Sequence, residues 1–334
     1  MAALPELPDG LTVRPLRADD VASVAALLAA AELLDDTGEY PDAGDMSEWF
    51  TGWDMDLDRD GLAVCDPADV LVAYATVMAP RNFREALAVY LEGRVRPDQR
   101  GRGVGRALLA WQLARGAELH AERQPGETAR LTVEVPGAMT SLESLARRAG
   151  LTAERWYAQM QRPLTDLPEP REVPGIDLVP FTWDRDEEVR LAHNASFTQH
   201  HGSAERDAET WRAVFTGQRA FRPDLSVVAL EDGAVVGYVL AYVYEADVVA
   251  TGIRQVSFGQ IGVLPQARGR GLASAAITAA LRAAAEDDCK RADLGVDTEN
   301  VTGALRLYES LGFVTTRTSV SWSVDRPPLS EPRA

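Results

Sequence analysis

The chain carries one glycine- and arginine-rich pattern twice, 168 positions apart. The first copy is Arg100-Gly101-Arg102-Gly103-Val104-Gly105 after Val95-Arg96-Pro97, and the second is Arg268-Gly269-Arg270-Gly271-Leu272-Ala273 after Val263-Leu264-Pro265. Each lies between an apolar run and an alanine- and leucine-rich segment, which predicts a turn from a strand into a helix. Glycines let the backbone approach a ligand, a helix start attracts anions, and arginines add charge-assisted hydrogen bonds to phosphate. The pattern therefore predicts a phosphorylated ligand and a duplicated fold.

Three further matches support an internal duplication. Pro15 matches Pro180, Ala73-Tyr74 matches Gly237-Tyr238, and residues 145–151 match residues 307–313, always in the same order along the chain. The offsets drift between 162 and 168 positions, as loops of different length would cause. An ordered set of matches at a nearly constant offset is the signature of a repeat. We interpret the chain as two diverged copies of one domain.

The joint between the copies is rich in proline. With 334 residues the chain suits two domains of ordinary size. Pro163, Pro168, Pro170 and Pro174 lie in a charged stretch that can continue neither a helix nor a central strand. We expect a first domain over 1–164, a linker over 165–175, a second domain over 176–326 and a tail over 327–334.

Each copy is expected to be an α/β domain with a mixed central sheet flanked by helices. In the second copy we predict strands over 176–181, 226–230, 235–243, 255–263, 292–296 and 314–324, and helices over 187–197, 272–286 and 302–311. Gly312 is expected at the C′ position of the last helix, and Thr302 at its N-cap.

Composition excludes several classes of protein. The net charge of −17 argues against a nucleic-acid partner, and neither glycine pattern has the Gly-Lys-Ser/Thr ending of a P-loop. No apolar run approaches 18 residues, and the N-terminus lacks the features of a signal peptide. Cys65 and Cys289, one in each half, are expected to be reduced core thiols. We therefore expect a cytoplasmic protein with no membrane partner and no metal site.

A second motif follows the second glycine pattern. Asn300, Ala304, Leu307-Tyr308 and Leu311-Gly312-Phe313 come after the predicted strand 292–296. With this pair of motifs the chain resembles the GCN5-related N-acetyltransferase (GNAT) family, over nearly its whole length and as two tandem domains. The resemblance implies transfer of an acetyl group from acetyl-CoA, or another short acyl-CoA, to the primary amine of a small molecule.

The resemblance also implies roles for individual residues. Backbone groups of Ile261, Gly262 and Val263 would pair with the pantetheine arm and the acyl carbonyl. Asn300 would contact the cofactor, although one extra residue separates it from Ala304 compared with the usual motif. Tyr308 would protonate the departing CoA thiolate, a role that suits a phenol with a pKa of about 10. Backbone N–H groups would hold the pyrophosphate, from Arg268, Gly269, Arg270, Gly271, Leu272, Ala273 and Ser274.

The first copy keeps the glycine pattern but not the second motif. Tyr308 corresponds to Ala146, and Asn300 falls near Ala138. We therefore expect the second domain to catalyse, while the first binds acyl-CoA or serves only as a scaffold. The residues of that possible cofactor site are Val95, Arg100, Gly101, Arg102, Gly103, Val104 and Gly105.

A free alkyl amine has a pKa near 10.4 and is therefore protonated at neutral pH. Before the amine can attack, a base must remove this proton. The candidate bases are His200, His201, Glu245, Asp247 and Glu299, and no spacing selects among them. The two histidines are also candidate substrate contacts. The tandem halves with their proline-rich joint are similar to mycothiol synthases, which acetylate a cysteinyl amino-sugar conjugate. In those enzymes an acidic residue on the strand entering the second turn is the proposed base, but residues 255–263 contain no carboxylate. We therefore favour a different small amine; the alternatives are a mycothiol synthase and a non-catalytic acyl-CoA-binding sensor or scaffold.

Overall fold

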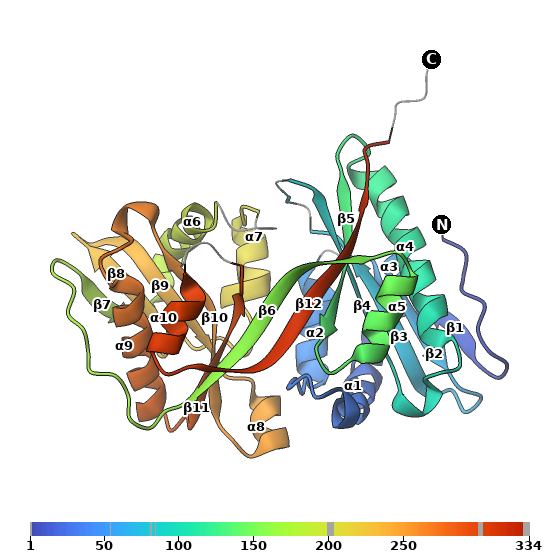
Figure 1. Cartoon of the computed structure of the whole chain (residues 1–334), viewed down its shortest axis with the longest axis horizontal. Helices are drawn as coiled ribbons and strands as arrows, with labels where there is room; N and C mark the ends of the chain where they lie inside the picture. Colours follow the sequence, from blue (N-terminus) through green and yellow to red (C-terminus); the bar gives the residue numbers. More distant parts are fainter. Residues whose placement is uncertain are drawn as a thin grey trace. The chain divides into compact units, whose positions relative to one another are not determined.

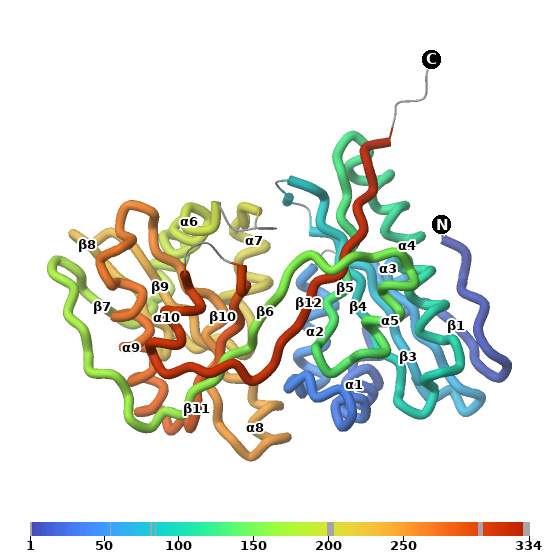
Figure 2. The backbone as a smooth tube through the Cα atoms, in the orientation of Figure 1, coloured from blue at the N-terminus to red at the C-terminus, as the bar shows by residue number. Residues whose placement is uncertain are grey.

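A computed structural model describes residues 2–53, 55–80, 82–83, 85–198, 204–299 and 303–329. The chain divides into two compact units. Unit 1 comprises the described residues of 1–155 and 319–334, and unit 2 comprises those of 156–318. Figures 1 and 2 trace the chain through both units.

Unit 1 is an α/β unit. Its elements are β1 (Thr12–Pro15), α1 (Val21–Asp35), α2 (Ala43–Gly52), α3 (Leu57–Asp60), β2 (Gly61–Cys65), β3 (Leu71–Met78), β4 (Leu87–Val95), α4 (Val104–Arg123), β5 (Ala129–Pro136), α5 (Thr140–Arg148), the start of β6 (Thr152–Pro163) and the end of β12 (Val314–Arg326). Its strands are ordered β1-β2-β3-β4-β5-β12. β4 and β5 pair in parallel, whereas the pairs β1–β2, β2–β3, β3–β4 and β5–β12 are antiparallel, so the sheet is mixed.

Unit 2 repeats this plan. Its elements are β7 (Asp177–Pro180), α6 (Asp186–Ser196), α7 (Ala208–Trp211), β8 (Val227–Glu231), β9 (Ala234–Tyr242), α8 (Glu245–Thr251), β10 (Gln255–Val263), α9 (Leu272–Glu286), β11 (Arg291–Asp297), α10 (Ala304–Ser310), most of β6 and the start of β12. Its strands are ordered β7-β8-β9-β10-β11-β6, and only β10 and β11 pair in parallel. The predicted duplication and mixed sheets are thus present in the structure.

The two units exchange their last strands. β6 follows α5 of the first copy, yet its residues 157–163 pair with β11 in unit 2. β12 follows α10 of the second copy, yet its residues 319–326 pair with β5 in unit 1. The chain therefore crosses into unit 2 along β6, and the proline-rich stretch 165–175, which has no helix or strand, lies inside unit 2.

Helices cover both faces of each sheet. In unit 1, the core on one face joins α4 to β4 and β5, whereas α1 and α2 pack on the other face around Phe50 and Tyr74. In unit 2, α9 and α10 share a core with β10 and β11, and α6 and α7 pack on the opposite face around Trp211 and Tyr238. This arrangement leaves the glycine turns at one end of each central strand.

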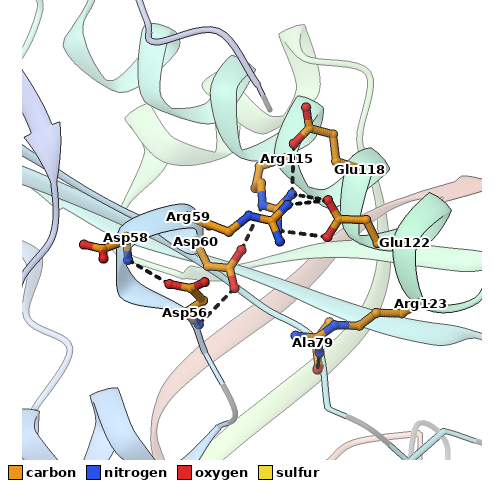
Figure 3. Close-up of polar contacts among 9 residues, drawn as sticks. All are labelled: Asp56, Asp58, Arg59, Asp60, Ala79, Arg115, Glu118, Glu122 and Arg123. Carbon is orange, nitrogen blue, oxygen red and sulfur yellow. Dashed lines mark hydrogen bonds and ion pairs between the residues drawn. The ribbon is translucent and has the colours of Figure 1, made fainter.

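A buried arginine anchors the long helix of unit 1. Arg115 on α4 is 1% exposed and donates to Asp60 (2.8 Å), Glu118 (2.9 Å) and Glu122 (3.0 Å). Figure 3 shows these carboxylates around the guanidinium group. Burying a cation is tolerated when its N–H groups are all directed at acceptors. The network therefore fixes α4, and with it the turn at its start, against α3.

The other sequence expectations can be placed in the same way. The strand 255–263 and the helix 272–286 match β10 and α9 residue for residue. The last helix begins at Ala304 with Gly303 at its N-cap, and Thr302 lies outside the described residues. Cys65 and Cys289 are buried free thiols. Within the described ranges, no helix has the length and apolar character needed to cross a membrane.

Candidate functional site

The two glycine turns have the same backbone conformation. The φ angles are 77° and 95° at Gly101 and Gly103, and 78° and 83° at Gly269 and Gly271. Such left-handed values strain other residues but not glycine. Gly103 and Gly271 are the N-caps of α4 and α9, and neither helix start has a side-chain cap. The first N–H groups of both helices are therefore oriented to receive an anion.

Arg100 and Arg268 hold these turns in place. Arg100 donates through Nε to the carbonyl of Val95 (2.9 Å) and through both terminal nitrogens to Asp35, at 2.6 and 2.8 Å. Arg268 donates in the same way to Val263 (3.1 Å) and to the carbonyl of Ser196 (2.8 Å). Asp35 and Ser196 end α1 and α6. Each arginine therefore joins the strand exit to the first long helix of its unit, instead of offering its guanidinium group to a phosphate.

The second pair of arginines also has protein partners. Arg102 contacts Gln99 and the carbonyl of Asp9, and Arg270 forms an ion pair with Glu231 at 2.8 Å. A different cation lies at the second turn: a Cβ added to Gly271 would be 2.8 Å from Cζ of Arg171. Sequence analysis did not select Arg171, because it stands in the proline-rich stretch 100 residues before the turn.

Among the residues that the structure describes, the last part of the strand leading into the second turn pairs with another strand on one side only. β10 pairs with β9 from Ser257 to Val263, with a bulge between Phe258 and Gln260. On its other side, β10 pairs with β11 at only three positions, and Ser257 opposite Asp293 is the last pair. We call this last pair and the divergence beyond it the fork. Past the fork, alternate residues of β10 direct backbone groups away from β9, where an extended ligand can pair with them.

Ile261, Gly262 and Val263 lie on this part of β10, as the sequence predicted. Gly262 packs directly on Tyr238: a Cβ there would be 2.5 Å from Cε1 of the ring. The Tyr238 hydroxyl is 2.8 Å from Nδ1 of His193, and both side chains are buried. The Tyr238–His193 pair therefore packs against β10 at Gly262 and supports the strand there. The carbonyl of Val263 accepts one hydrogen bond from Nε of Arg268, at 3.1 Å.

Tyr308 is placed by the helix end that the sequence predicted. The N–H of Phe313 donates to the carbonyl of Tyr308 (3.0 Å), and that of Gly312, at φ 85°, donates to Glu309 (3.0 Å). These two bonds form a Schellman motif. Tyr308 is 8% exposed and packs edge-on against Phe313. Burial raises the pKa of its phenol to about 12, so the group stays protonated at neutral pH.

Some predicted site residues fall outside the description. Asn300, His200 and His201 are not among the described residues. Of the other candidate bases, Glu245 begins α8 and pairs with Arg222 (2.8 Å) and Arg254 (3.3 Å). Asp247 also lies on α8, and Glu299 is exposed after β11.

Two carboxylates that sequence reasoning did not select lie next to the parallel strand pairs. Asp293, at the fork of unit 2, is 6% exposed, and burial raises its pKa. Glu92, on β4 of unit 1, is half-buried, and desolvation raises its pKa to about 8. Of the two, Asp293 lies at the rung where β10 and β11 part, and its raised pKa suits it to proton transfer. The only sequence signal for Asp293 was a charged residue inside an otherwise apolar strand.

Comparison with known proteins gives one consistent answer. Residues 187–313 match the family described as Acetyltransferase (GNAT) family. A mycothiol acetyltransferase of Frankia casuarinae is 34% identical over 279 residues, which cover 78% of this chain and 74% of that protein. One of Frankia alni is 31% identical and covers 93% and 94%. The crystal structure of a GCN5-related N-acetyltransferase from Sphaerobacter thermophilus superposes with a TM-score of 0.76 at 25% identity, covering 97% and 98%.

Proposed function

Since this chain belongs to the GNAT acetyltransferase family, we propose that it transfers an acetyl group from acetyl-CoA to the primary amine of a small molecule, and that unit 2 catalyses the transfer. One comparison supports this choice of unit. Both units have the glycine turn, but Tyr308 of unit 2 is replaced by the buried Ala146 in unit 1.

In this proposal the acyl-CoA lies along the free edge of β10. Its pyrophosphate accepts hydrogen bonds from the N–H groups of Gly269 to Ser274, and the charge of Arg171 beside Gly271 adds attraction. Ile261 and Gly262 pair with the pantetheine arm, and the thioester lies near the fork. Unit 1 offers a second turn of the same conformation, which binds acyl-CoA or supports the fold.

Tyr308 then acts on the leaving group. The amine nitrogen attacks the thioester carbon, the C–S bond breaks, and charge develops on sulfur. A thiol has a pKa of about 8.5, so full transfer from a phenol of pKa about 12 is uphill by roughly 5 kcal/mol. Tyr308 therefore contributes first as a hydrogen-bond donor to the sulfur, and the surplus proton of the new amide nitrogen replaces the one that it gives up.

The acceptor is a primary amine of low molecular weight. The two Frankia relatives are named mycothiol acetyltransferases, so a cysteinyl amino sugar belongs among the first compounds to test. The absence of a carboxylate on β10 is the reason for testing other amines beside it.

The proposal is tested with purified protein, acetyl-CoA and three amines: glucosamine, cysteine ethyl ester and a cysteinyl-glucosamine conjugate. We expect mass spectrometry to detect the N-acetylated form of at least one amine, in proportion to the CoA released. Tight binding of acetyl-CoA with no turnover on any of these amines would favour the alternative of an acyl-CoA sensor or scaffold.

A further inference from the structure

Three polar residues form one row across the fork of unit 2. Tyr242 on β9 pairs with Ser257 on β10, and Ser257 pairs with Asp293 on β11. Directly paired residues project from the same face of a sheet. Their neighbours Val256 and Leu294 belong to the α9–α10 core, so the row projects from the opposite face. The row therefore stands on the last rung before the strands part.

Both ends of this row have an unused polar atom. Oδ2 of Asp293 accepts from Nε2 of Gln159 (2.8 Å), but Oδ1 is buried with no hydrogen-bond partner among the described residues. The same holds for the hydroxyl of Tyr242, which is 3% exposed. Buried polar atoms without partners are rare and destabilising. The tie to Gln159 already serves a structural purpose, so the free oxygen points to a ligand that donates a hydrogen bond.

The surroundings of Asp293 favour a proton acceptor. The next residue on that face of β11 is Gly295, which is exposed and adds no side chain beside the carboxylate. Burial raises the pKa of Asp293, while the polar groups of Ser257 and Gln159 and the charges of Arg291 and Arg317 oppose the rise. A carboxylate with a raised pKa is a stronger base than an exposed aspartate.

From this geometry we propose that Asp293 accepts the proton of the substrate amine, with Tyr242 and Ser257 lining the same amine site; this assignment rests on the proposed function. The ammonium group gives one proton to Oδ1, and the neutral nitrogen then forms the C–N bond as the C–S bond breaks. Tyr308 belongs to the α9–α10 core on the other face. The amine thus approaches from one face of the fork, and the thiolate departs toward the other.

Unit 1 lacks this arrangement. Its parallel strands part after Tyr90 opposite Thr132, so no carboxylate stands on the corresponding rung. The carboxyl group of unit 1 with a raised pKa is Glu92, which lies on β4 two residues after Tyr90. Glu92→Gln is therefore the matched control for Asp293→Asn, because each change removes one carboxylate near a fork.

The experiment measures kcat/KM against pH for the three amines named above. In the wild type, kcat/KM should rise with pH through the raised pKa of Asp293. At pH 6.5 we expect Asp293→Asn to lower kcat/KM by about 100-fold or more. The difference in kcat/KM between the wild type and Asp293→Asn should become smaller as the pH approaches the pKa of the amine, where the amine loses its proton without help. The Kd of acetyl-CoA should be the same in both proteins. We call the rise of kcat/KM with pH on the acidic side of the profile the acidic limb. Asp293→Glu should keep this limb but have a lower kcat. Glu92→Gln should have the kcat/KM and the pH profile of the wild type.

The assignment would be overturned if Asp293→Asn kept the wild-type rate and profile, or if Glu92→Gln alone removed the acidic limb. If Asp293→Asn does not fold, the pH profile of the wild-type protein alone decides: a kcat/KM that does not rise with pH on the acidic side overturns the assignment as well. A wild type that acetylates none of the amines removes the proposed function together with this role. By contrast, an active wild type that is slowed by Tyr308→Phe but not by Asp293→Asn removes the role of Asp293 alone.

Discussion

Tyr308 and Ala146 occupy the same position in two identical helix ends. The carbonyl of Tyr308 accepts from the N–H of Phe313 at 3.0 Å, and the carbonyl of Ala146 accepts from that of Leu151 at 3.1 Å. The glycine before each donor has a positive φ, 85° at Gly312 and 88° at Gly150. The duplicated backbone has therefore been kept, while the phenol is found in unit 2 and not at the matching place in unit 1.

Tyr308→Phe should lower kcat by about 100-fold, because general-acid groups contribute on that order. The free energy of unfolding should change little, since the ring keeps its packing against Phe313. Turnover and urea unfolding measure the two effects separately. Tyr74→Phe, which removes a buried phenol from unit 1, is the control and should leave kcat unchanged; a wild-type kcat in Tyr308→Phe would refute the role.

Gly271→Ala should weaken acetyl-CoA binding by about tenfold or more, the equivalent of 1.4 kcal/mol. Alanine is strained at a φ of 83°, and its methyl group, 2.8 Å from Cζ of Arg171, would push that flexible guanidinium group away from the turn. Isothermal titration calorimetry measures the Kd. Gly103→Ala is the matched change in unit 1, where the nearest atom is 3.7 Å away. It should leave kcat unchanged, and a loss of turnover confined to Gly103→Ala would place catalysis in unit 1.

Arg100→Met should destabilise unit 1 by about 2 kcal/mol, because the buried carboxylate of Asp35 loses its bidentate partner and keeps only Arg94 at 3.6 Å. Arg268→Met should cost only about 1 kcal/mol, since Arg268 contacts backbone carbonyls and is exposed. Urea unfolding of both variants tests the difference. Equal losses would show that the two arginines serve one structural purpose.

The Arg115 network should make the free energy of unfolding depend on pH in the acidic range. The hydrogen bond from Arg115, the largest cause, lowers the pKa of Glu122 in the folded state. A lowered carboxyl pKa stabilises the fold above the unfolded-state value and loses that effect as the pH falls through the folded-state pKa. The urea midpoints of the wild type and Glu122→Gln should therefore differ at pH 7 and converge below pH about 4. Glu143→Gln, which removes a surface pair with Arg147, should show little effect at either pH.

Local sequence patterns predicted the elements around the second turn well. The bounds of β10 and α9 were predicted residue for residue, because a glycine turn and polar loops mark both ends of each element. The exchange of β6 and β12 was not predicted. Both strands follow the last helix of a copy and can pair with β5 or β11 equally well by pattern, so only long-range packing decides between the partners.

The site was predicted in part for the same reason. Gly271 and Tyr308 belong to contiguous motifs and were selected from them. Arg268 was read as a phosphate donor, but its partner is the carbonyl of Ser196, 72 residues away. Asp293 was missed because its environment depends on where the ladder between β10 and β11 ends, and the strand sequence does not encode that point.

The central claim is that acetyl transfer takes place in unit 2, and a crystal structure with acetyl-CoA bound tests it most directly. We predict the pyrophosphate at the N–H groups of Gly269 to Ser274, and the thioester sulfur within hydrogen-bond distance of the Tyr308 hydroxyl. Acetyl-CoA bound only at the turn of Gly101 to Gly105, with the fork of unit 2 empty, would contradict the account.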